Sequence, residues 1–246
     1  MESDRQLNLS IKETNQYLEK VSPESRLEWA IQNFDKQFAL TTSFGIQSSV
    51  LLHMIHLIKG KENAKIIWVD TGYLPKETYN YADQLTNRLN LNITVVQSDI
   101  SPARMEALYG KLWEENSIKD FEKYNSIRKV EPLEKAFKNF NINCWASGVR
   151  KDQTQHRKSM NFLDPFRDRL ALRPLLDWTK KEIFYYMQDN NLPQHPLFEK
   201  GYSTVGDWHS SGPDNINKKG RETRFGGLKE ECGIHLGNTT EGKNNN

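Results

Sequence analysis

The chain contains two cysteines, which differ in the sequence that surrounds them. Cys144 lies within the apolar run Ile142-Asn-Cys-Trp-Ala146, so we expect it to pack in the core. Cys232 lies in a polar, glycine-rich stretch close to the C-terminus, where an unused thiol would be open to oxidation. A reactive role therefore explains Cys232 better, and the chemistry that it offers is nucleophilic attack by a thiolate.

The Cys232 thiol needs a nearby cation to ionise at neutral pH. A thiol with the reference pKa of about 8.5 is only about a few per cent thiolate at pH 7. The adjacent carboxylates of Glu230 and Glu231 disfavour the thiolate further. The candidate cations are Arg224, Lys229, His235 and the basic cluster near Arg150, and the sequence does not choose among them.

Small polar residues follow a predicted strand in the segment Thr41-Thr-Ser-Phe-Gly-Ile-Gln-Ser-Ser49. Such a turn at the start of a helix exposes backbone N–H groups and the positive end of the helix dipole, which suit phosphate or sulfate. Helix capping by the serines is the alternative. The candidate binding residues in this segment are Ser43, Phe44, Gly45, Gln47 and Ser48.

Two further polar segments also follow predicted strands. Asp70 and Gly72 end the second strand, where ligands gather in a parallel sheet, and Asp70 either holds an adenosine hydroxyl or amine or caps the next turn. Arg150 and Lys151 follow a later strand, with Gln153 in the same turn. Arginine grips a phosphate bidentately and lysine acts as a point charge, so this pair is our candidate phosphate site, with a solvated basic helix start as the alternative.

The segments above need a scaffold, and the hydrophobic pattern supplies one. Alternating strands and helices predict βαβ units and hence a mostly parallel sheet flanked by helices, an α/β fold. The loops after the strands then meet at one edge of that sheet. The predicted strands are 38–42, 65–70, 93–97 and 142–146, and the predicted helices are 47–58, 75–89, 131–140 and the segment capped by Thr179 and Glu182 that ends near Asn190.

The pattern divides the chain into three regions. Residues 1–36 are predicted to be helical, with Ser22 as an N-cap and Pro23 at the first helical position. Residues 37–200 form the predicted α/β nucleotide-binding domain. Residues 201–246 hold nine of the fourteen glycines and little periodic apolar sequence, so we expect a flexible C-terminal tail that carries the catalytic cysteine.

The composition excludes several classes of function. Lys and Arg number 34 against 32 Asp and Glu, and this balance argues against a surface that binds long nucleic acids. No apolar window reaches the roughly 18 residues of a membrane span, and the N-terminus has no signal core, so we expect a cytoplasmic protein that contacts no membrane. The two cysteines cannot supply the four thiolates of an iron–sulfur or zinc site from one chain.

Taken in order, these segments resemble the sulfonucleotide reductases, and specifically the thioredoxin-dependent phosphoadenylyl-sulfate (PAPS) reductases. The run Glu-Thr-Arg-Phe-Gly-Gly-Leu-Lys-Glu-Glu-Cys-Gly-Ile-His235 matches the C-terminal signature of that family, whose cysteine is the nucleophile. The resemblance covers about residues 25 to 237. The upstream segments that match are Ser-Phe-Gly-Ile-Gln47, Asp-Thr-Gly-Tyr73, Tyr-Gly-Lys-Leu-Trp113, Lys-Val-Glu-Pro-Leu133 and Gly-Val-Arg-Lys-Asp-Gln153.

The resemblance implies an ATP-pyrophosphatase-like, or adenine nucleotide alpha hydrolase-like, fold in which Ser43 to Gln47 replaces the pyrophosphate loop. Relatives that reduce adenylyl sulfate (APS) carry a Cys-Cys pair and a later Cys-x-x-Cys that hold an iron–sulfur cluster. Here Asn125-Ser126 stands at the first pair and Val205-Gly-Asp-Trp208 lies near the second, which favours PAPS and no cluster. Lys151-Asp152 stands where the family leads us to expect Arg-Glu, so a cluster-free APS reductase remains the alternative.

The implied reaction is the reduction of PAPS to sulfite and adenosine 3′,5′-bisphosphate, in which Cys232 attacks the sulfonate and thioredoxin then releases sulfite. Arg150, Lys151 and Arg224 would neutralise the substrate's charge. No flavin is implied, glutaredoxin is an alternative reductant, and a homodimer stays open. Two rival functions are an ATP pyrophosphatase of the same broad fold and a non-enzymatic nucleotide-binding protein.

Overall fold

The computed structural model describes residues 10–60, 62, 64–114, 117–227 and 234. Their centre is a six-stranded sheet in the order β3-β2-β1-β4-β6-β5. Neighbouring strands are parallel except for the antiparallel β5–β6 pair, which confirms the mostly parallel sheet. The strands are β1 (Phe38–Thr42), β2 (Lys65–Val69), β3 (Ile93–Val96), β4 (Cys144–Ala146), β5 (Leu163–Phe166) and β6 (Arg169–Leu172).

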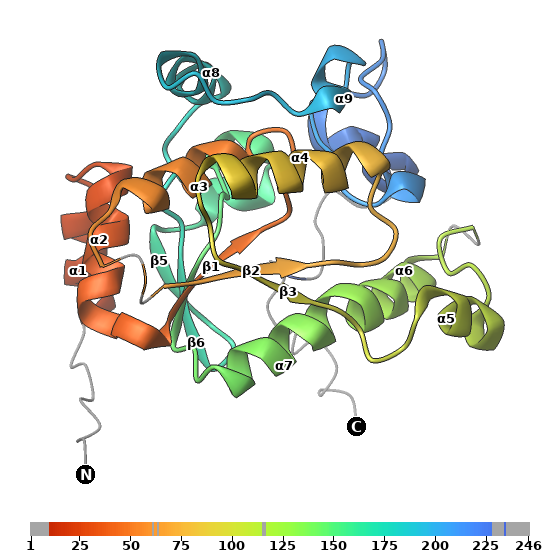
Figure 1. Cartoon of the computed structure of the whole chain (residues 1–246), viewed down its shortest axis with the longest axis horizontal. Coiled ribbons are helices and arrows are strands. Elements are labelled where there is room, and N and C mark those ends of the chain that lie inside the picture. Colours follow the sequence, from red (N-terminus) through yellow and green to blue (C-terminus); the bar gives the residue numbers. More distant parts are fainter. Residues whose placement is uncertain (1–9, 61, 63, 115–116, 228–233, 235–246) are drawn as a thin grey trace, which may run out of the picture.

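Helices cover both faces of the sheet (Figure 1). Successive β1 residues point to opposite faces, as the strand period requires, so Phe38 and Leu40 join one hydrophobic cluster while Ala39 joins another. The first cluster packs under α2 (Pro23–Phe34), α3 (Ser48–Leu57), α4 (Lys76–Arg88) and α8 (Lys180–Asp189). The second packs on α7 (Glu131–Asn139). Burial on both faces explains why β1, β2 and β4 are nearly continuous apolar runs.

The predicted helix starts are confirmed in detail. The side chain of Ser22 accepts a hydrogen bond of 3.2 Å from the backbone N–H of Ser25, and Pro23 opens α2. Thr179 and Glu182 form the expected capping box at the start of α8. The other α-helices of the described residues are α1 (Ile11–Leu18), α5 (Pro102–Tyr109), α6 (Ile118–Asn125) and α9 (Pro196–Glu199).

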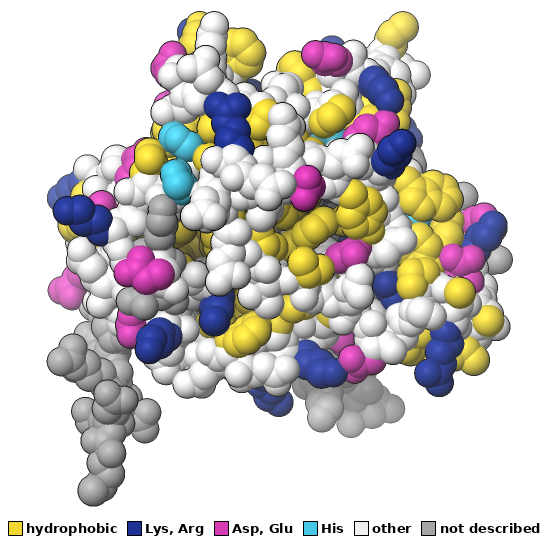
Figure 2. Space-filling model, in the orientation of Figure 1, with side chains coloured by type: hydrophobic (Ala, Val, Ile, Leu, Met, Phe, Trp, Pro, Cys, Tyr) yellow, Lys and Arg dark blue, Asp and Glu magenta, His cyan; other side chains and the backbone are white. Residues whose placement is uncertain are grey.

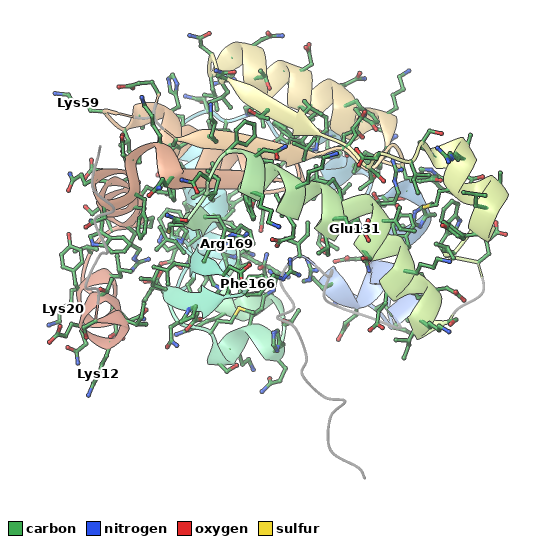
Figure 3. The ribbon with its side chains drawn as sticks, turned by 90° about the horizontal axis from the view of Figure 1, so that it is seen from below. Lys12, Lys20, Lys59, Glu131, Phe166 and Arg169 are labelled. Atoms are coloured by element: carbon green, nitrogen blue, oxygen red, sulfur yellow. The ribbon has the colours of Figure 1, made fainter. Side chains whose placement is uncertain are left out.

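The β5–β6 hairpin is an element that the sequence pattern did not predict. Pro165 lies in β5, and it is tolerated there because β5 is an edge strand that needs hydrogen bonds on one side only. Phe166 packs in the α7 cluster, and Arg169 Nη1 forms an ion pair of 2.7 Å with Glu134 Oε2 on α7. Figure 3, seen from the α7 side, labels Phe166 and Arg169 close to each other at one side of that helix.

A π-helical turn, η3 (Ser126–Val130), joins α6 to α7. Ser126 Oγ donates a hydrogen bond of 2.8 Å to Glu131 Oε1 across the junction, and Figure 3 labels Glu131 at the start of α7. Within the same turn, Arg128 is buried and donates hydrogen bonds to the backbone carbonyls of Thr71 and Ile100. Such π-helical turns frequently occur at functional sites, and this one lies against the loop that follows β2.

Residues 201–227 lie beside α9 and include η6 (Trp208–Ser210) and η7 (Gly220–Gly227) (Figure 1). Val205 is buried and packs with Leu197 of α9 and Ile46 of the loop after β1. Part of the region predicted as a tail therefore contacts the α/β domain, whereas its flexibility stays a prediction. Across the described residues, no helix has both the length and the apolar composition needed to cross a bilayer.

Candidate functional site

The order of the strands creates a crevice between β1 and β4. From β1 the chain moves through β2 to β3 on one side of the sheet, and β4 lies on the other side of β1. At such a switch point the loops after the two strands separate and leave room for a ligand. A cavity of about 240 Å³, which we call the main cavity, lies there. Its lining includes Ser43, Gly45, Gln47, Ser48, Ser147, Gly148, Arg150 and Gln153.

A second cavity of about 470 Å³, which we call the outer cleft, adjoins the main cavity. The two share Gln47, Arg150, Gln153, Ser203, Thr204 and Arg221 in their linings. The charged residues that the outer cleft adds are Lys158, Lys180 and Lys219 together with Asp152 and Glu222. On the face seen in Figure 2, by contrast, Lys and Arg are scattered among Asp and Glu without a continuous basic surface. The chain's small net charge thus accompanies a local concentration of cations around the two cavities.

The loop after β1 brings four of its five candidate residues to the main cavity, namely Ser43, Gly45, Gln47 and Ser48. Phe44 is instead fully buried, with its ring edge-to-face against Trp68 at a centroid distance of 4.9 Å. Its φ of +46° lies in a region that bulky residues rarely adopt, and its N–H donates to Thr42 Oγ1 at 3.2 Å. Phe44 therefore anchors the loop to the hydrophobic core and does not face the cavity.

Arg150 is the cation that connects the two loops of the main cavity. Its side chain is 3% exposed, donates from Nη1 to Gln47 Oε1, and donates from Nε to Asp152 Oδ1 at 3.1 Å. The backbone N–H of Arg150 donates to Gln153 Oε1 at 2.9 Å, and that oxygen also accepts from the buried Arg157. Burial lowers the pKa of Arg150 and the Asp152 carboxylate opposes this shift, so the guanidinium stays charged at neutral pH.

Lys151 does not accompany Arg150 into either cavity. Its Nζ lies 6.0 Å from the centroid of the Phe162 ring, and the residue is exposed. The three-residue helical turn that starts at Lys151 explains the difference, since consecutive residues of a helical turn point in different directions. Of the two predicted phosphate contacts, the structure brings only Arg150 to the site.

Asp70 and Gly72 shape the loop after β2, outside the lining of both cavities. The Asp70 carboxylate accepts hydrogen bonds from the Gly72 N–H at 2.8 Å, from Tyr79 Oη at 2.7 Å and from Gln97 Nε2 at 2.7 Å. Gly72 has a φ of +74°, and a Cβ atom there would lie 2.6 Å from Pro102 Cγ. The geometry thus matches the turn-capping alternative for Asp70 and explains the glycine by its conformation.

Sequence reasoning did not assign three cations that the structure brings to the main cavity, Lys129, Arg157 and Arg221. Lys129 belongs to η3 and forms an ion pair of 2.5 Å with the buried Asp207. The segment Lys129 to Leu133 was noticed only as part of a familiar motif. Its role at the cavity depends on tertiary contacts with residues much later in the chain.

Cys144 is confirmed as a core residue, because it is fully buried in β4 and burial raises the pKa of its thiol. Cys232 lies outside the described residues, and so does the side chain of Arg224, whose backbone belongs to η7. Ile234, two positions after Cys232 in the sequence, is described. It lines the main cavity and packs with the α7 cluster.

The mostly parallel sheet, covered by helices on both faces and open at its switch point, defines the chain as an α/β protein of the class that binds ligands at the carboxyl ends of its strands. FMN adenylyltransferase of Candida glabrata, solved with FMN and the ATP analogue AMPCPP, has the same fold. The two structures superpose with a TM-score of 0.57 over 90% of this chain and 73% of that chain, at 16% sequence identity.

Residues 37–213 match the phosphoadenosine phosphosulfate reductase domain. The phosphoadenosine 5′-phosphosulfate reductase of Synechococcus sp. is 49% identical over 228 residues, covering 92% of this chain and 97% of that protein. The enzyme of Vibrio cholerae is 44% identical over 230 residues, covering 94% and 90%. The crystal structure of PAPS reductase from Candida auris, a phosphate complex, superposes with a TM-score of 0.72 at 26% identity over 84% of this chain and 99% of that one. The chain belongs to the phosphoadenosine phosphosulfate reductase family.

Proposed function

We propose that this protein reduces PAPS to sulfite and adenosine 3′,5′-bisphosphate in sulfate assimilation, through an S-sulfonated Cys232 and with thioredoxin as reductant. The observation that carries the proposal is the composition of the main cavity. The polar loop after β1, the buried Arg150 and Ile234 all line this one cavity. Ile234 follows Cys232 by two positions in the sequence. A nucleotide anion site and the segment of the nucleophile therefore belong to the same cavity in this proposal.

The loop after β1 is the proposed cradle for the sulfate or phosphate of the substrate. Ser43, Gly45, Gln47 and Ser48 offer hydroxyl, amide and backbone donors at the start of α3. Arg150 adds a fixed positive charge to the same cavity. Gln153 holds Arg150 in place, because its side-chain oxygen accepts a hydrogen bond from the backbone N–H of Arg150. In the same proposal Phe44, Asp70 and Gly72 keep the loops in shape, while Arg224 remains a candidate contact from the C-terminal segment.

The outer cleft is the proposed site of the 3′-phosphate, the group that distinguishes PAPS from APS. Lys158, Lys180 and Lys219 line this cleft. A doubly charged phosphate requires several cations, and the three lysines of the cleft would supply them. Lys151 would not contribute, because its side chain extends toward the Phe162 ring. Preference for PAPS over APS is the expected consequence, and comparable turnover of the two nucleotides would favour the APS alternative.

The proposed reaction consists of two displacements at sulfur. The Cys232 thiolate attacks the sulfonate sulfur, an S–S bond forms, and the bond from sulfur to the phosphate oxygen breaks, so adenosine 3′,5′-bisphosphate leaves with the electron pair. A thioredoxin thiolate then attacks Cys232 Sγ and sulfite leaves with the electrons of the S–S bond. The second thioredoxin thiol closes a disulfide and frees Cys232. Cations at the cavity stabilise the charge that develops on each leaving group.

The dithiol supplies both electrons, so the proposed reaction requires neither a flavin nor an iron–sulfur cluster. Glutaredoxin is the alternative donor, since it carries the same chemistry. The proposal includes a cytoplasmic location, because Cys232 must be a free thiol and cytosolic thiols are kept reduced. A homodimer is compatible with the scheme, which needs the residues of one chain only.

Sulfite release tests the proposal directly. Purified protein is incubated with thioredoxin, its reductase and NADPH, with PAPS in one reaction, APS in a second and ATP in a third. We expect sulfite from PAPS, much less from APS and no pyrophosphate from ATP. Pyrophosphate release from ATP would favour the pyrophosphatase alternative. Nucleotide binding without any product would favour a non-enzymatic protein.

A further inference from the structure

Lys129 and Asp207 form an ion pair that is almost completely removed from water. Lys129 Nζ lies 2.5 Å from Asp207 Oδ2, and the two side chains are 8% and 0% exposed. Lys129 lines the main cavity, whereas Asp207 does not. Asp207 therefore does not line the cavity itself, but it contacts Lys129, which does.

Asp207 is itself fixed by the loop after β2. Thr71 Oγ1 donates to Asp207 Oδ1 at 2.5 Å. The backbone N–H of Trp208 donates to the Tyr73 carbonyl at 2.8 Å, and Ser211 Oγ donates to the Asp207 carbonyl at 2.9 Å. Hydrogen bonds to the side chain of Asp207 and to the backbone around it thus fix the position of the carboxylate.

Lys129 lies on the side of the main cavity that the helical segment before α7 forms. Leu133 follows Lys129 by four residues, lies on the same side of the helical segment and also lines the cavity. Leu133 belongs to the α7 cluster, against which Ile234 packs. Lys129 is therefore a cation that the helical segment before α7 brings to the cavity that Ile234 also lines, whereas Arg150 and Gln47 come from the loops after β4 and β1.

A buried ammonium group requires a counter-ion, because a buried charge is costly unless it is paired. Burial alone would raise the pKa of Asp207, but the Lys129 ammonium and the hydrogen bonds from Lys129 and Thr71 outweigh it and keep that pKa below its usual range. Asp207 is thus an anion at neutral pH. Its charge pairs with the Lys129 ammonium group at 2.5 Å, and its fixed position limits the directions in which the Lys129 side chain extends.

We propose that Asp207 is a positioning residue for the first displacement, acting through Lys129, whose ammonium group it holds toward the sulfonate of the bound nucleotide. This inference rests on the proposed function. Lys129 then stabilises charge on the transferring sulfonate, and Asp207 contributes only while Lys129 is present. The expected signature is a loss in kcat with little change in KM, because the nucleotide is bound mainly by the loops after β1 and β4 and by the outer cleft.

A double-mutant cycle tests this dependence. We expect Asp207→Asn to lower kcat for PAPS about 10²-fold, with KM within about threefold. Lys129→Met is expected to lower kcat at least as much, and the double variant Asp207→Asn/Lys129→Met to match Lys129→Met within about threefold, because the two residues act as one unit. Affinity for adenosine 3′,5′-bisphosphate, measured by calorimetry, is expected to stay unchanged throughout. Losses that multiply in the double variant would overturn the inference.

Matched controls separate the outcomes. Asp99→Asn makes the same exchange in the exposed Lys135–Asp99 pair and is expected to leave kcat unchanged. If Asp207→Asn fails to fold because it leaves a buried charge unpaired, the neutral double variant decides, and full activity in that folded variant overturns the inference. Wild-type protein that turns over PAPS beside an Asp207→Asn variant with unchanged kcat overturns the inference alone. Wild-type protein that binds nucleotide but releases no sulfite overturns the proposed function and the inference together.

Discussion

Arg150 Nη1 donates a hydrogen bond to Gln47 Oε1, which joins the loop after β4 to the loop after β1. The same guanidinium is held from the other side by Asp152 at 3.1 Å. These contacts fix the distance between two walls of the main cavity and leave Arg150 little freedom. The planar, multiply donating head group is thus part of the architecture of the site as well as a source of charge.

Arg150→Lys is therefore expected to lower kcat/KM for PAPS about 10- to 100-fold, although the charge is conserved. A lysine cannot bond to Gln47 and Asp152 while facing an anion, and one charge-assisted hydrogen bond contributes about 1.5 to 3 kcal/mol. Steady-state sulfite release measures the change. Arg88→Lys, at an exposed arginine that donates to the Asn191 carbonyl, is the control and should keep wild-type turnover. An equal effect in both variants would contradict the role of Arg150.

Cys232→Ser is expected to abolish sulfite formation, whereas Cys144→Ala should retain most turnover. Cys144 is fully buried in the core, so its loss affects packing and lowers the melting temperature rather than kcat. Turnover and thermal unfolding of both variants check this difference. Equal losses of turnover in two well-folded variants would show that Cys232 is not the sole nucleophile.

PAPS added without a reductant should convert Cys232 to its S-sulfonate and then stop, with one adenosine bisphosphate released per site. Cys144 cannot act as a resolving thiol because burial both hides it and raises its pKa. Peptide mass spectrometry should find the mass of SO₃ on the Cys232 peptide and not on the Cys144 peptide. A Cys144–Cys232 disulfide, or sulfite release without thioredoxin, would contradict the two-displacement mechanism.

Lys180→Gln should lower kcat/KM for PAPS about three- to tenfold and leave that for APS unchanged. The side chain lines the outer cleft, so in the proposed binding mode its loss removes one partly solvated contact to the 3′-phosphate, which APS does not have. Lys181→Gln is the control, since Lys181 lies next in sequence but extends over the Tyr185 ring at 5.7 Å. Parallel losses for both nucleotides would show that the cleft does not read the 3′-phosphate.

His195 predicts a pH dependence of stability. Its ring is buried between Thr78 and the N-terminus of α9, and burial lowers its pKa from 6.5 to about 4. Unfolding releases this penalty, so the unfolded chain binds more protons between about pH 6.5 and 4, and stability falls as the pH falls through that window. The loss reaches about 3 kcal/mol at the acid limit, at about 1.4 kcal/mol per pKa unit.

The contribution of His195 is measured by urea unfolding at pH 7 and pH 4.5. His195→Asn keeps an N-cap side chain but cannot titrate in this range, so the variant should lose less stability on acidification than the wild-type protein. An identical pH dependence in both proteins would show that other groups determine the acid sensitivity.

The sequence predicted the regular half of the fold because that half obeys local rules. Strands β1 and β2 and helices α3 and α4 were predicted to within one or two residues, since buried parallel strands and capped helices have clear patterns. The β5–β6 hairpin was missed because Pro165 and the charged turn hide its alternation. Its register depends on pairing with β4, which no local pattern records.

The same limit applies to the site. The loops after β1 and β4 were recognised because small polar residues after a strand have a known geometry, and the structure brings both to the main cavity. The direction of a side chain was not predictable from position, so Phe44 and Lys151 were proposed as contacts although they face the core and the Phe162 ring. The pairing of Lys129 with Asp207 depends on the folding of distant segments onto each other.

Two cations of the main cavity carry their own counter-ions, Arg150 with Asp152 and Lys129 with Asp207. A polyanion that binds there contacts directed hydrogen-bond donors whose positive charge the two carboxylates already partly neutralise. In the proposed reaction the product, adenosine 3′,5′-bisphosphate, keeps both phosphates after the sulfonate has left. A cavity of fully uncompensated cations would retain that product, so internal neutralisation favours release and allows each molecule of enzyme to act repeatedly.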